Sequence, residues 1–231
     1  MWGHTPYTQI AKIQNNLVRS FEFLGVNRSA PTVAMLGDMG WLSMLTITQI
    51  SCVRFWLRLT KMSENRLNQK IFTEAHRLAC MGYKNWIART LDILNKDRTE
   101  LDLNPMCTLD HNPDIHQYKE CLVARFRNEW QKEINRVPEG SESGGRLGMY
   151  RRIKKEPVPE IYVASKNSVG VRRVIAGLRL GCLPLAVEVG RYTGTTCIER
   201  VCRLCGTGEV EDQNHFLINC PSLSHIRQNA L

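Results

Sequence analysis

The sequence has no long apolar run. None of its hydrophobic stretches reaches the length of about 20 residues that a membrane-spanning helix needs. Residues 1–16 also lack the basic segment followed by an apolar segment that is typical of a secretory signal peptide. We therefore expect an intracellular protein of the nucleus or cytoplasm, which is neither secreted nor associated with a membrane.

Acidic residues are in deficit. The 231 residues include 31 Lys and Arg but only 22 Asp and Glu, which gives a formal net charge of +9. Such an excess favours a polyanionic partner, above all RNA or DNA. A basic, solvated surface without any partner would have the same composition. The hydrophobic content of 43% is ordinary, and the length suits one domain or two small ones.

Cysteine is not scarce, but most of it is scattered. Of the nine cysteines, six occur singly, and some of these lie inside apolar helical patterns: Cys52, Cys80, Cys107, Cys121, Cys182 and Cys197. Isolated thiols of this kind are typical of reduced, buried cysteines in an intracellular protein. The remaining three lie close together near the end of the chain, around a single histidine.

These residues form a C-x2-C…H-x4-C array, made of Cys202, Cys205, His215 and Cys220. A tight turn with Gly206 in positive φ would place the first two thiolates on one ion. A short helix over the intervening FLIN would bring the second pair to the same ion. Zinc prefers four such ligands in a tetrahedron, so we predict a Zn²⁺ site. Ordinary buried cysteines and a disulfide are the alternatives. The looser set Cys107, His111 and His116 lacks a fourth ligand, and we do not predict a site there.

Apolar residues recur at helical spacing through most of the chain. The pattern predicts helices over residues 5–24, 43–62, 66–80, 85–94, 112–137 and 168–180, with a short helical piece after Pro31. A last helix over 222–231 stops abruptly, as if the chain continued. We predict a mainly α fold: a helical bundle over 1–137, a flexible linker rich in Gly and Ser at 138–149, and a basic segment with a small zinc-stabilised subdomain over 150–231.

The part after the linker also carries the densest basic cluster, beside Tyr150. Basic residues next to an aromatic ring suit a phosphate backbone with a stacked base. The candidate nucleic-acid-binding residues are Arg151, Arg152, Lys154, Lys155, Arg172, Arg173, Arg179, Arg200 and Arg203. A solvated surface with no partner is the alternative.

Two segments carry a resemblance to a known family. Residues 176–192 contain an arginine-bearing helix, a G-x-L-P-L turn and a G-R-Y element, and residues 211–221 read E-x-x-x-H-F-L-x-x-C-P. Together they resemble the C-terminal tail of non-LTR (LINE-type) retrotransposon reverse transcriptase polyproteins, with its zinc-knuckle-like motif. Residues 23–41 and 54–72 are similar to the region that follows the polymerase in such elements. The gap of nine residues between Cys205 and His215 exceeds the four of retroviral nucleocapsid knuckles.

The resemblance implies an origin beside endonuclease and reverse transcriptase domains, in a region that holds template RNA or target DNA during target-primed reverse transcription. The chain itself has no Y/F-x-D-D motif and no carboxylate cluster for two-metal nucleotidyl transfer. Four protein ligands would leave zinc no position for a reacting water. We therefore expect a non-catalytic zinc module that binds nucleic acid. The alternatives are a structural domain that docks on a polymerase absent from this chain, and a relic reading frame without a function.

Overall fold

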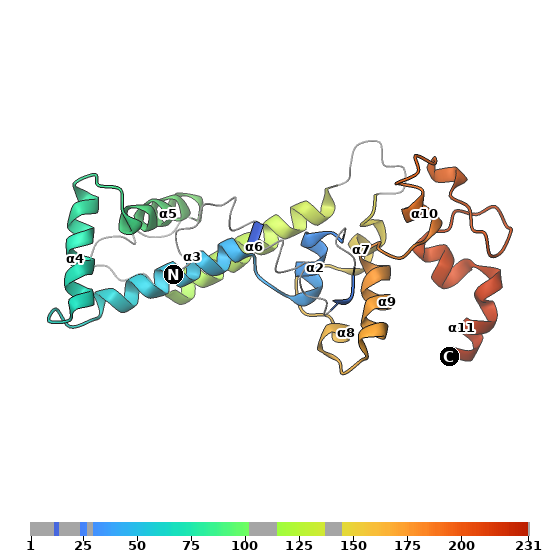
Figure 1. Ribbon diagram of the computed structural model, residues 1–231, viewed down its shortest axis with the longest axis horizontal. Coiled ribbons are helices and arrows are strands. Elements are labelled where there is room, and N and C mark those ends of the chain that lie inside the picture. Colours follow the sequence, from blue (N-terminus) through green and yellow to red (C-terminus); the bar gives the residue numbers. More distant parts are fainter. Residues whose placement is uncertain (1–11, 14–23, 27–29, 102–114, 137–144, 231) are drawn as a thin grey trace. The chain divides into compact units, whose positions relative to one another are not determined.

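The computed structural model describes residues 12–13, 24–26, 30–101, 115–136 and 145–230 (Figure 1). Within these ranges the chain is mainly helical and has no β-strand, only an isolated antiparallel bridge between Val201 and Val210. The predicted mainly α fold is therefore confirmed. The helix predicted over 5–24 lies almost wholly outside the described residues, as do Cys107, His111 and residues 138–144 of the predicted linker.

Contacts divide the chain into two compact units, one of residues 1–15 and 42–128 and the other of residues 16–41 and 129–231. The first unit is built from α3 (Met44–Thr60), α4 (Leu67–Cys80), α5 (Trp86–Leu101) and the first part of α6 (Ile115–Asn135). Helix α3 is capped by Ser43, whose Oγ accepts a hydrogen bond of 3.1 Å from the Thr46 N–H. Such a cap satisfies a backbone donor that the helix itself leaves unpaired.

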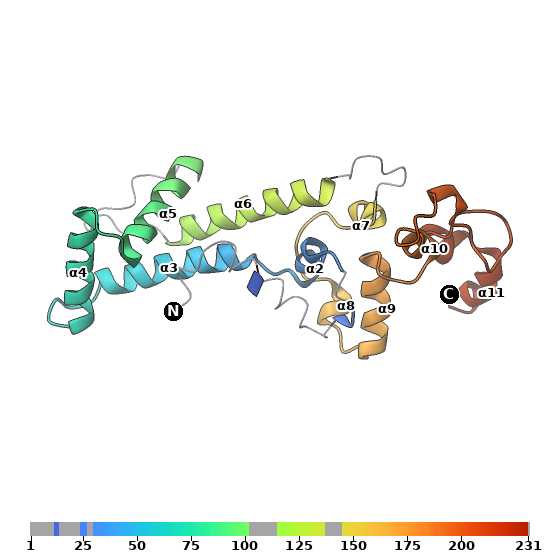
Figure 2. The same cartoon turned by 45° about the horizontal axis from the view of Figure 1, so that its top comes forward.

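Two apolar clusters hold this unit together, and α3 takes part in both. Its residues Ile50, Val53 and Leu57 pack with Leu94 of α5 and with α6, which runs beside α3 in Figure 2. The other cluster centres on Trp56, whose ring meets Phe72 of α4 edge to face at 5.0 Å and 84°. Edge-to-face packing of this kind is a favourable aromatic geometry.

The helix boundaries follow the predicted ones closely, with one exception. Helix α5 continues to Leu101, beyond the predicted end at residue 94. Residues 95–101 no longer continue the apolar stripe, but Lys, Arg, Glu and Leu are good helix formers and neither Gly nor Pro interrupts them. Among the described helices, none has both the length and the apolar character that crossing a bilayer would require.

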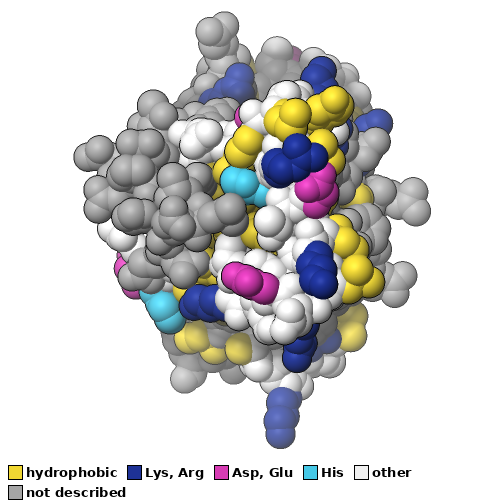
Figure 3. All heavy atoms as spheres, turned by 90° about the vertical axis from the view of Figure 1, so that its left-hand side faces the viewer, with side chains coloured by type: hydrophobic (Ala, Val, Ile, Leu, Met, Phe, Trp, Pro, Cys, Tyr) yellow, Lys and Arg dark blue, Asp and Glu magenta, His cyan; other side chains and the backbone are white. Residues whose placement is uncertain are grey.

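Helix α4 exposes apolar residues as well as charged ones. Leu67 and Ile71 are 70% and 56% exposed, while Phe72 is buried. Figure 3 looks at this end of the first unit and shows hydrophobic side chains between Lys and Arg side chains.

The second unit consists of short helices joined by turns. They are α2 (Thr32–Met39), the last part of α6, α7 (Gly148–Ile153), α8 (Ile161–Ala164), α9 (Val169–Arg179), α10 (Ala186–Val189), the single-turn elements η2 (Cys197–Glu199), η3 (His215–Asn219) and η4 (Pro221–Leu223), and α11 (Ser224–Ala230). Helix α7 begins inside the segment predicted as a linker. There Arg146 Nε donates to the Gly181 carbonyl over 2.9 Å and Gly145 is buried, so this part of the segment is packed.

A buried carboxylate, that of Asp38, joins four helices of this unit. Its oxygens accept hydrogen bonds from the hydroxyls of Tyr150 at 3.0 Å and Tyr162 at 2.7 Å. They also accept two from Arg179, at 2.8 and 3.0 Å. Helix α2 therefore packs with α7, α8 and α9, although it precedes the predicted linker in the sequence. The charge of Asp38 is paired and fully hydrogen-bonded, as a buried charge must be.

Close packing between α2, α6 and α7 depends on Gly37. A Cβ atom at this position would lie 2.6 Å from the Tyr150 hydroxyl and 2.7 Å from the Trp130 ring. Trp130 in turn donates its ring N–H to the Val33 carbonyl over 2.9 Å. Glycine costs a helix interior about 1 kcal/mol relative to alanine, and here it leaves room for two aromatic side chains.

Candidate metal centre

A short hairpin presents the first two cysteines. The Cys202 N–H donates to the Glu209 carbonyl over 2.8 Å, and the Glu211 N–H donates to the Arg200 carbonyl over 2.9 Å. Between them the chain turns through Gly206 and Gly208, whose φ angles are 66° and 78°. Glycine adopts this left-handed region without a steric penalty, as the sequence predicts for Gly206. The hairpin thus places the Cys202 and Cys205 thiols on one side of the turn.

A wide helical turn, η3, presents the second pair. It begins at His215, whose N–H donates a hydrogen bond of 2.7 Å to Oδ1 of the preceding Asp212. It closes with a hydrogen bond of 2.7 Å from the Cys220 N–H to the His215 carbonyl, five residues earlier. This i→i+5 spacing is that of a π-helix, which occurs mostly as single turns and often at functional sites. The helical turn predicted over FLIN is present, and Pro221 begins the next element.

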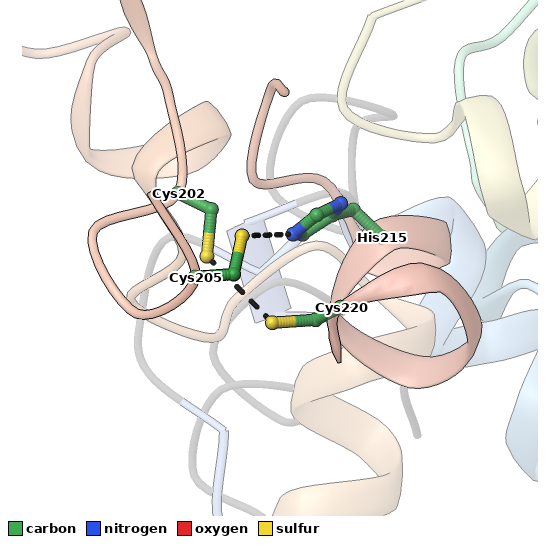
Figure 4. Close-up of side chains that lie close together, drawn as sticks. All are labelled: Cys202, Cys205, His215 and Cys220. Carbon is green, nitrogen blue, oxygen red and sulfur yellow. Dashed lines mark hydrogen bonds between the residues drawn. The ribbon is translucent and has the colours of Figure 1, made fainter. Parts of the chain in front are cut away.

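The hairpin and the turn bring all four side chains together (Figure 4). Their ligand atoms lie within 4.8 Å of one another. The sulfurs of Cys202 and Cys220 are 3.9 Å apart, and Cys205 Sγ is 3.4 Å from His215 Nε2. Cys202, His215 and Cys220 are buried, and Cys205 is partly exposed. The predicted residues can therefore hold one metal ion.

The surroundings favour a thiolate at Cys205. A hydrogen bond with the Thr207 hydroxyl, 3.1 Å away, lowers the pKa of the Cys205 thiol to about 6. Burial raises the pKa of Cys220. At His215, burial acts to lower the pKa, but hydrogen bonds with Cys205 and Glu209 outweigh it and raise the pKa.

Glu209 is a functional candidate that the sequence analysis missed. Its Oε2 lies 2.8 Å from His215 Nδ1, on the opposite side of the ring from Cys205. Carboxylates commonly orient metal-binding histidines in this way. The only sequence signal for it is an acidic residue inside the hairpin, and many surface loops have one.

Two further side chains tie α10 to the hairpin. Glu211 Oε2 accepts from the Ala186 N–H at 2.8 Å. Arg200 donates to the Val187 carbonyl at 2.9 Å and to the Thr195 carbonyl at 3.0 and 2.7 Å. The four-residue cluster is therefore one part of a larger packed segment that starts at α10.

The structure separates the predicted nucleic-acid-binding residues into three groups. Three of the residues use their charged groups within the fold. Lys154 is 2% exposed, pairs with Glu160 and donates to the Val158 carbonyl at 2.6 Å. Arg179 pairs with Asp38, and Arg200 donates to the Val187 carbonyl of α10. Arg151 and Arg172 are half-buried and donate to the Ile134 and Asn167 carbonyls, at 3.3 and 3.0 Å. The others, Arg152, Lys155, Arg173 and Arg203, are exposed. Of the nine predicted residues, these four are therefore the ones that the structure leaves exposed.

Comparison with known proteins identifies no relative. No family model matches the chain, and no curated protein or solved structure matches it. The likeness to LINE-type polyproteins therefore stays a prediction, and function must be inferred from the residues and their geometry.

Proposed function

We propose that residues 186–230 form a non-catalytic zinc module, derived from a retrotransposon polyprotein, and that the basic surface around it binds RNA or DNA. The observation that carries this proposal is the convergence of three thiols and one imidazole within 4.8 Å. Zinc, nucleic acid and evolutionary origin are supported by separate observations.

Two of the separations between the ligand atoms are close to those of a zinc site. Zn–S bonds of about 2.3 Å and Zn–N bonds of about 2.0 Å in a tetrahedron separate two sulfurs by about 3.8 Å and a sulfur from a nitrogen by about 3.5 Å. The distances here are 3.9 Å between Cys202 and Cys220 and 3.4 Å between Cys205 and His215. Thiolate and imidazole are also ligand types that zinc accepts readily.

Four protein ligands favour a structural ion over a catalytic one. A catalytic zinc keeps one position open for water or substrate, and a tetrahedral Cys3His site fills all of them. The segment around the site buries few of its apolar residues: Ile198, Leu204 and Ile218 are 75%, 57% and 64% exposed. Metal binding would supply folding free energy that so small a core lacks.

The exposed cations supply the support for nucleic acid. Arg203 lies on the metal-binding hairpin, Arg152 and Lys155 lie on and after α7, and Arg173 lies on α9. Together with the net charge of +9 they suit a polyanion. The resemblance to LINE-type elements points the same way, since such a region would hold template RNA or target DNA.

The test combines metal analysis with a binding titration. The purified chain should contain zinc in a fixed stoichiometry, and fluorescence anisotropy should detect binding to single-stranded RNA or duplex DNA that weakens steeply as salt rises. Chelation of the metal should abolish the contribution of the module to RNA or DNA binding, and added zinc should restore that contribution. Zinc-free folded protein would refute the metal assignment, and affinity that does not change with salt would refute phosphate recognition.

One observation favours a second candidate, docking on a reverse transcriptase domain outside this chain. Leu67 and Ile71 on α4 are large apolar residues that remain exposed. Chains that carry zinc but bind neither RNA nor DNA would favour this candidate. Leu67→Ser would then be expected to weaken the association with such a domain.

A further inference from the structure

A cavity of about 240 Å³ opens beside the metal-binding turn. Three segments of the second unit form its walls: the packed end of the predicted linker with α7, the region of α10, and the turn that carries His215. The lining residues are Gly145, Gly148, Met149, Arg152, Ile153, Val187, Arg191, Asp212, Gln213, Asn214, Leu217 and Ile218.

The lining combines an apolar surface with a few polar groups. Met149, Ile153, Val187, Leu217 and Ile218 supply the apolar part, and the amides of Gln213 and Asn214 can both donate and accept hydrogen bonds. The charged side chains are those of Arg152, Arg191 and Asp212. Pockets for small ligands typically have this composition, with a few polar groups that fix the orientation.

The two arginines are the groups suited to an anion. Arg152 is exposed on α7. Arg191 Nε forms an ion pair with Glu188 Oε2 at 3.1 Å. The same carboxylate lies 3.9 Å from Arg146, so one negative charge is shared by two guanidinium groups, which together keep a positive charge. Asp212 is already engaged, because its Oδ1 accepts from the His215 N–H. A ligand phosphate would therefore meet the exposed Arg152 and an Arg191 that shares Glu188 with Arg146, while Asp212 is occupied elsewhere.

We propose that this cavity binds one nucleotide unit, with its base against the apolar wall and the two amides, and its phosphate beside Arg152 and Arg191. The inference rests on the proposed function, which it deepens by naming a site. Pockets for drug-sized ligands measure about 300–1,000 Å³, so this smaller cavity suits a single base and not a duplex. The unit is either a free nucleoside monophosphate or one nucleotide of a single strand, since both offer the same chemistry.

The cavity also depends on the metal site. Leu217 and Ile218 of its wall lie between the ligands His215 and Cys220, in the turn that the ion would fix. The neighbouring α10 is held by Arg146, which donates to Gly181 and lies 3.9 Å from Glu188. Removing the metal should therefore remove the nucleotide site as well.

The full chain loaded with zinc should be titrated with AMP, UMP, inorganic phosphate and a short single-stranded RNA. Arg152→Gln should weaken nucleotide binding about tenfold, since it removes one charge-assisted contact. Leu217→Trp should block it by filling the cavity, and unchanged zinc content would show that this variant folds. Met149→Trp, on another wall, serves the same purpose if Leu217→Trp loses zinc. Arg203→Gln is the matched control, because it removes an exposed arginine that does not line the cavity.

Loss of nucleotide binding in the cavity variants but not in Arg203→Gln would support the proposal. For the RNA strand, a larger loss in Arg152→Gln and Leu217→Trp than in Arg203→Gln would support it even without measurable binding of free AMP or UMP. Equal affinities in all variants would overturn it while leaving nucleic-acid binding intact. Phosphate binding as tight as nucleotide binding would also overturn it. Nucleotide binding without strand binding would support the cavity and contradict the proposed function, and the absence of both would overturn both.

Discussion

Arg179 donates two hydrogen bonds to Asp38, from Nε to Oδ2 at 2.8 Å and from Nη2 to Oδ1 at 3.0 Å. The carboxylate is fully buried, and the guanidinium is 14% exposed. The two residues are 141 positions apart in the sequence. This pair therefore fastens α9 to α2 in the interior of the second unit.

Breaking this pair should destabilise the protein strongly. Asp38→Ala leaves the Arg179 charge largely buried without its main partner, which typically costs about 3–5 kcal/mol in the free energy of unfolding. Urea denaturation would measure the change. Glu74→Ala is the control, since it removes the carboxylate of an exposed pair with Arg77, where solvent screens the attraction. Equal effects of the two substitutions would show that Asp38 is not the centre of the packing.

The tyrosines around Asp38 should make the fold sensitive to alkali. Burial, and after it the Asp38 carboxylate, raises the pKa of both Tyr150 and Tyr162 above the ordinary value of 10.0. Because the unfolded chain releases these protons more readily, the contribution of the tyrosines to stability is constant below pH 10 and falls above it, by about 1.4 kcal/mol per pH unit for each tyrosine.

Denaturation curves between neutral pH and pH values above 10 would test this sign. The variant Tyr150→Phe/Tyr162→Phe should lose stability overall but show a shallower decline with rising pH. Tyr192→Phe, at an exposed position, controls for the loss of a phenol. A decline as steep in the double variant as in the natural chain would assign the alkaline effect to other groups.

Removing a metal ligand should unfold only the end of the chain. His215→Ala or Cys205→Ser should lose zinc and make residues from about 197 onward sensitive to protease, because the metal supplies their folding free energy. Helices α3 to α6 should keep their circular dichroism. Cys197→Ser should retain zinc, since its thiol lies outside the cluster. A protease-resistant tail in His215→Ala would argue against a structural metal.

Glu209 should tune the metal site without being part of it. Glu209→Gln weakens the contact that orients His215, and we expect a loss of about tenfold in zinc affinity, the low end for such partners because the side chain is 60% exposed. Competition with a chromophoric chelator would measure it. Glu199→Gln, which alters an exposed carboxylate that accepts a hydrogen bond from the Thr196 hydroxyl, should leave the zinc affinity unchanged.

Two nearby arginines should behave differently on substitution. Arg200→Gln should lower the stability of residues 186–230, because it releases the Val187 and Thr195 carbonyls. Arg203→Gln should leave stability unchanged but weaken RNA binding and reduce the slope of its salt dependence by about one. Thermal melts and titrations at several salt concentrations separate the two effects. The reverse pattern would show that the contacts of Arg200 do not determine its role.

The sequence predicts the metal cluster well because the cluster is local. Cys202, Cys205, His215 and Cys220 lie within one hairpin and one turn, so their spacing largely determines which atoms can meet. The main helices are equally predictable from the sequence, because an apolar period of 3.6 residues is a property of each helix by itself. Both inferences required only information from neighbouring residues.

The centre of the second unit could not be predicted in the same way. Asp38 stands in a GDMG stretch with no pattern around it, and its partners come from distant segments. For the same reason the sequence does not distinguish a basic residue that is exposed to solvent from one whose charge is paired inside the fold. Lys154 and Lys155 are adjacent, but the first is buried against Glu160 and the second is exposed.

Which residues can occupy positions 37, 130 and 150 depends on the close packing at Gly37. A methyl group there would collide with the Trp130 ring and the Tyr150 hydroxyl, so alanine at 37 requires a smaller residue at 130 and a changed side chain at 150. Homologous chains should therefore vary at these positions together, and a designed Gly37→Ala chain should regain stability only with compensating changes at both. Such joint variation would identify relatives of this protein even where the residues of the metal-binding cluster had been lost.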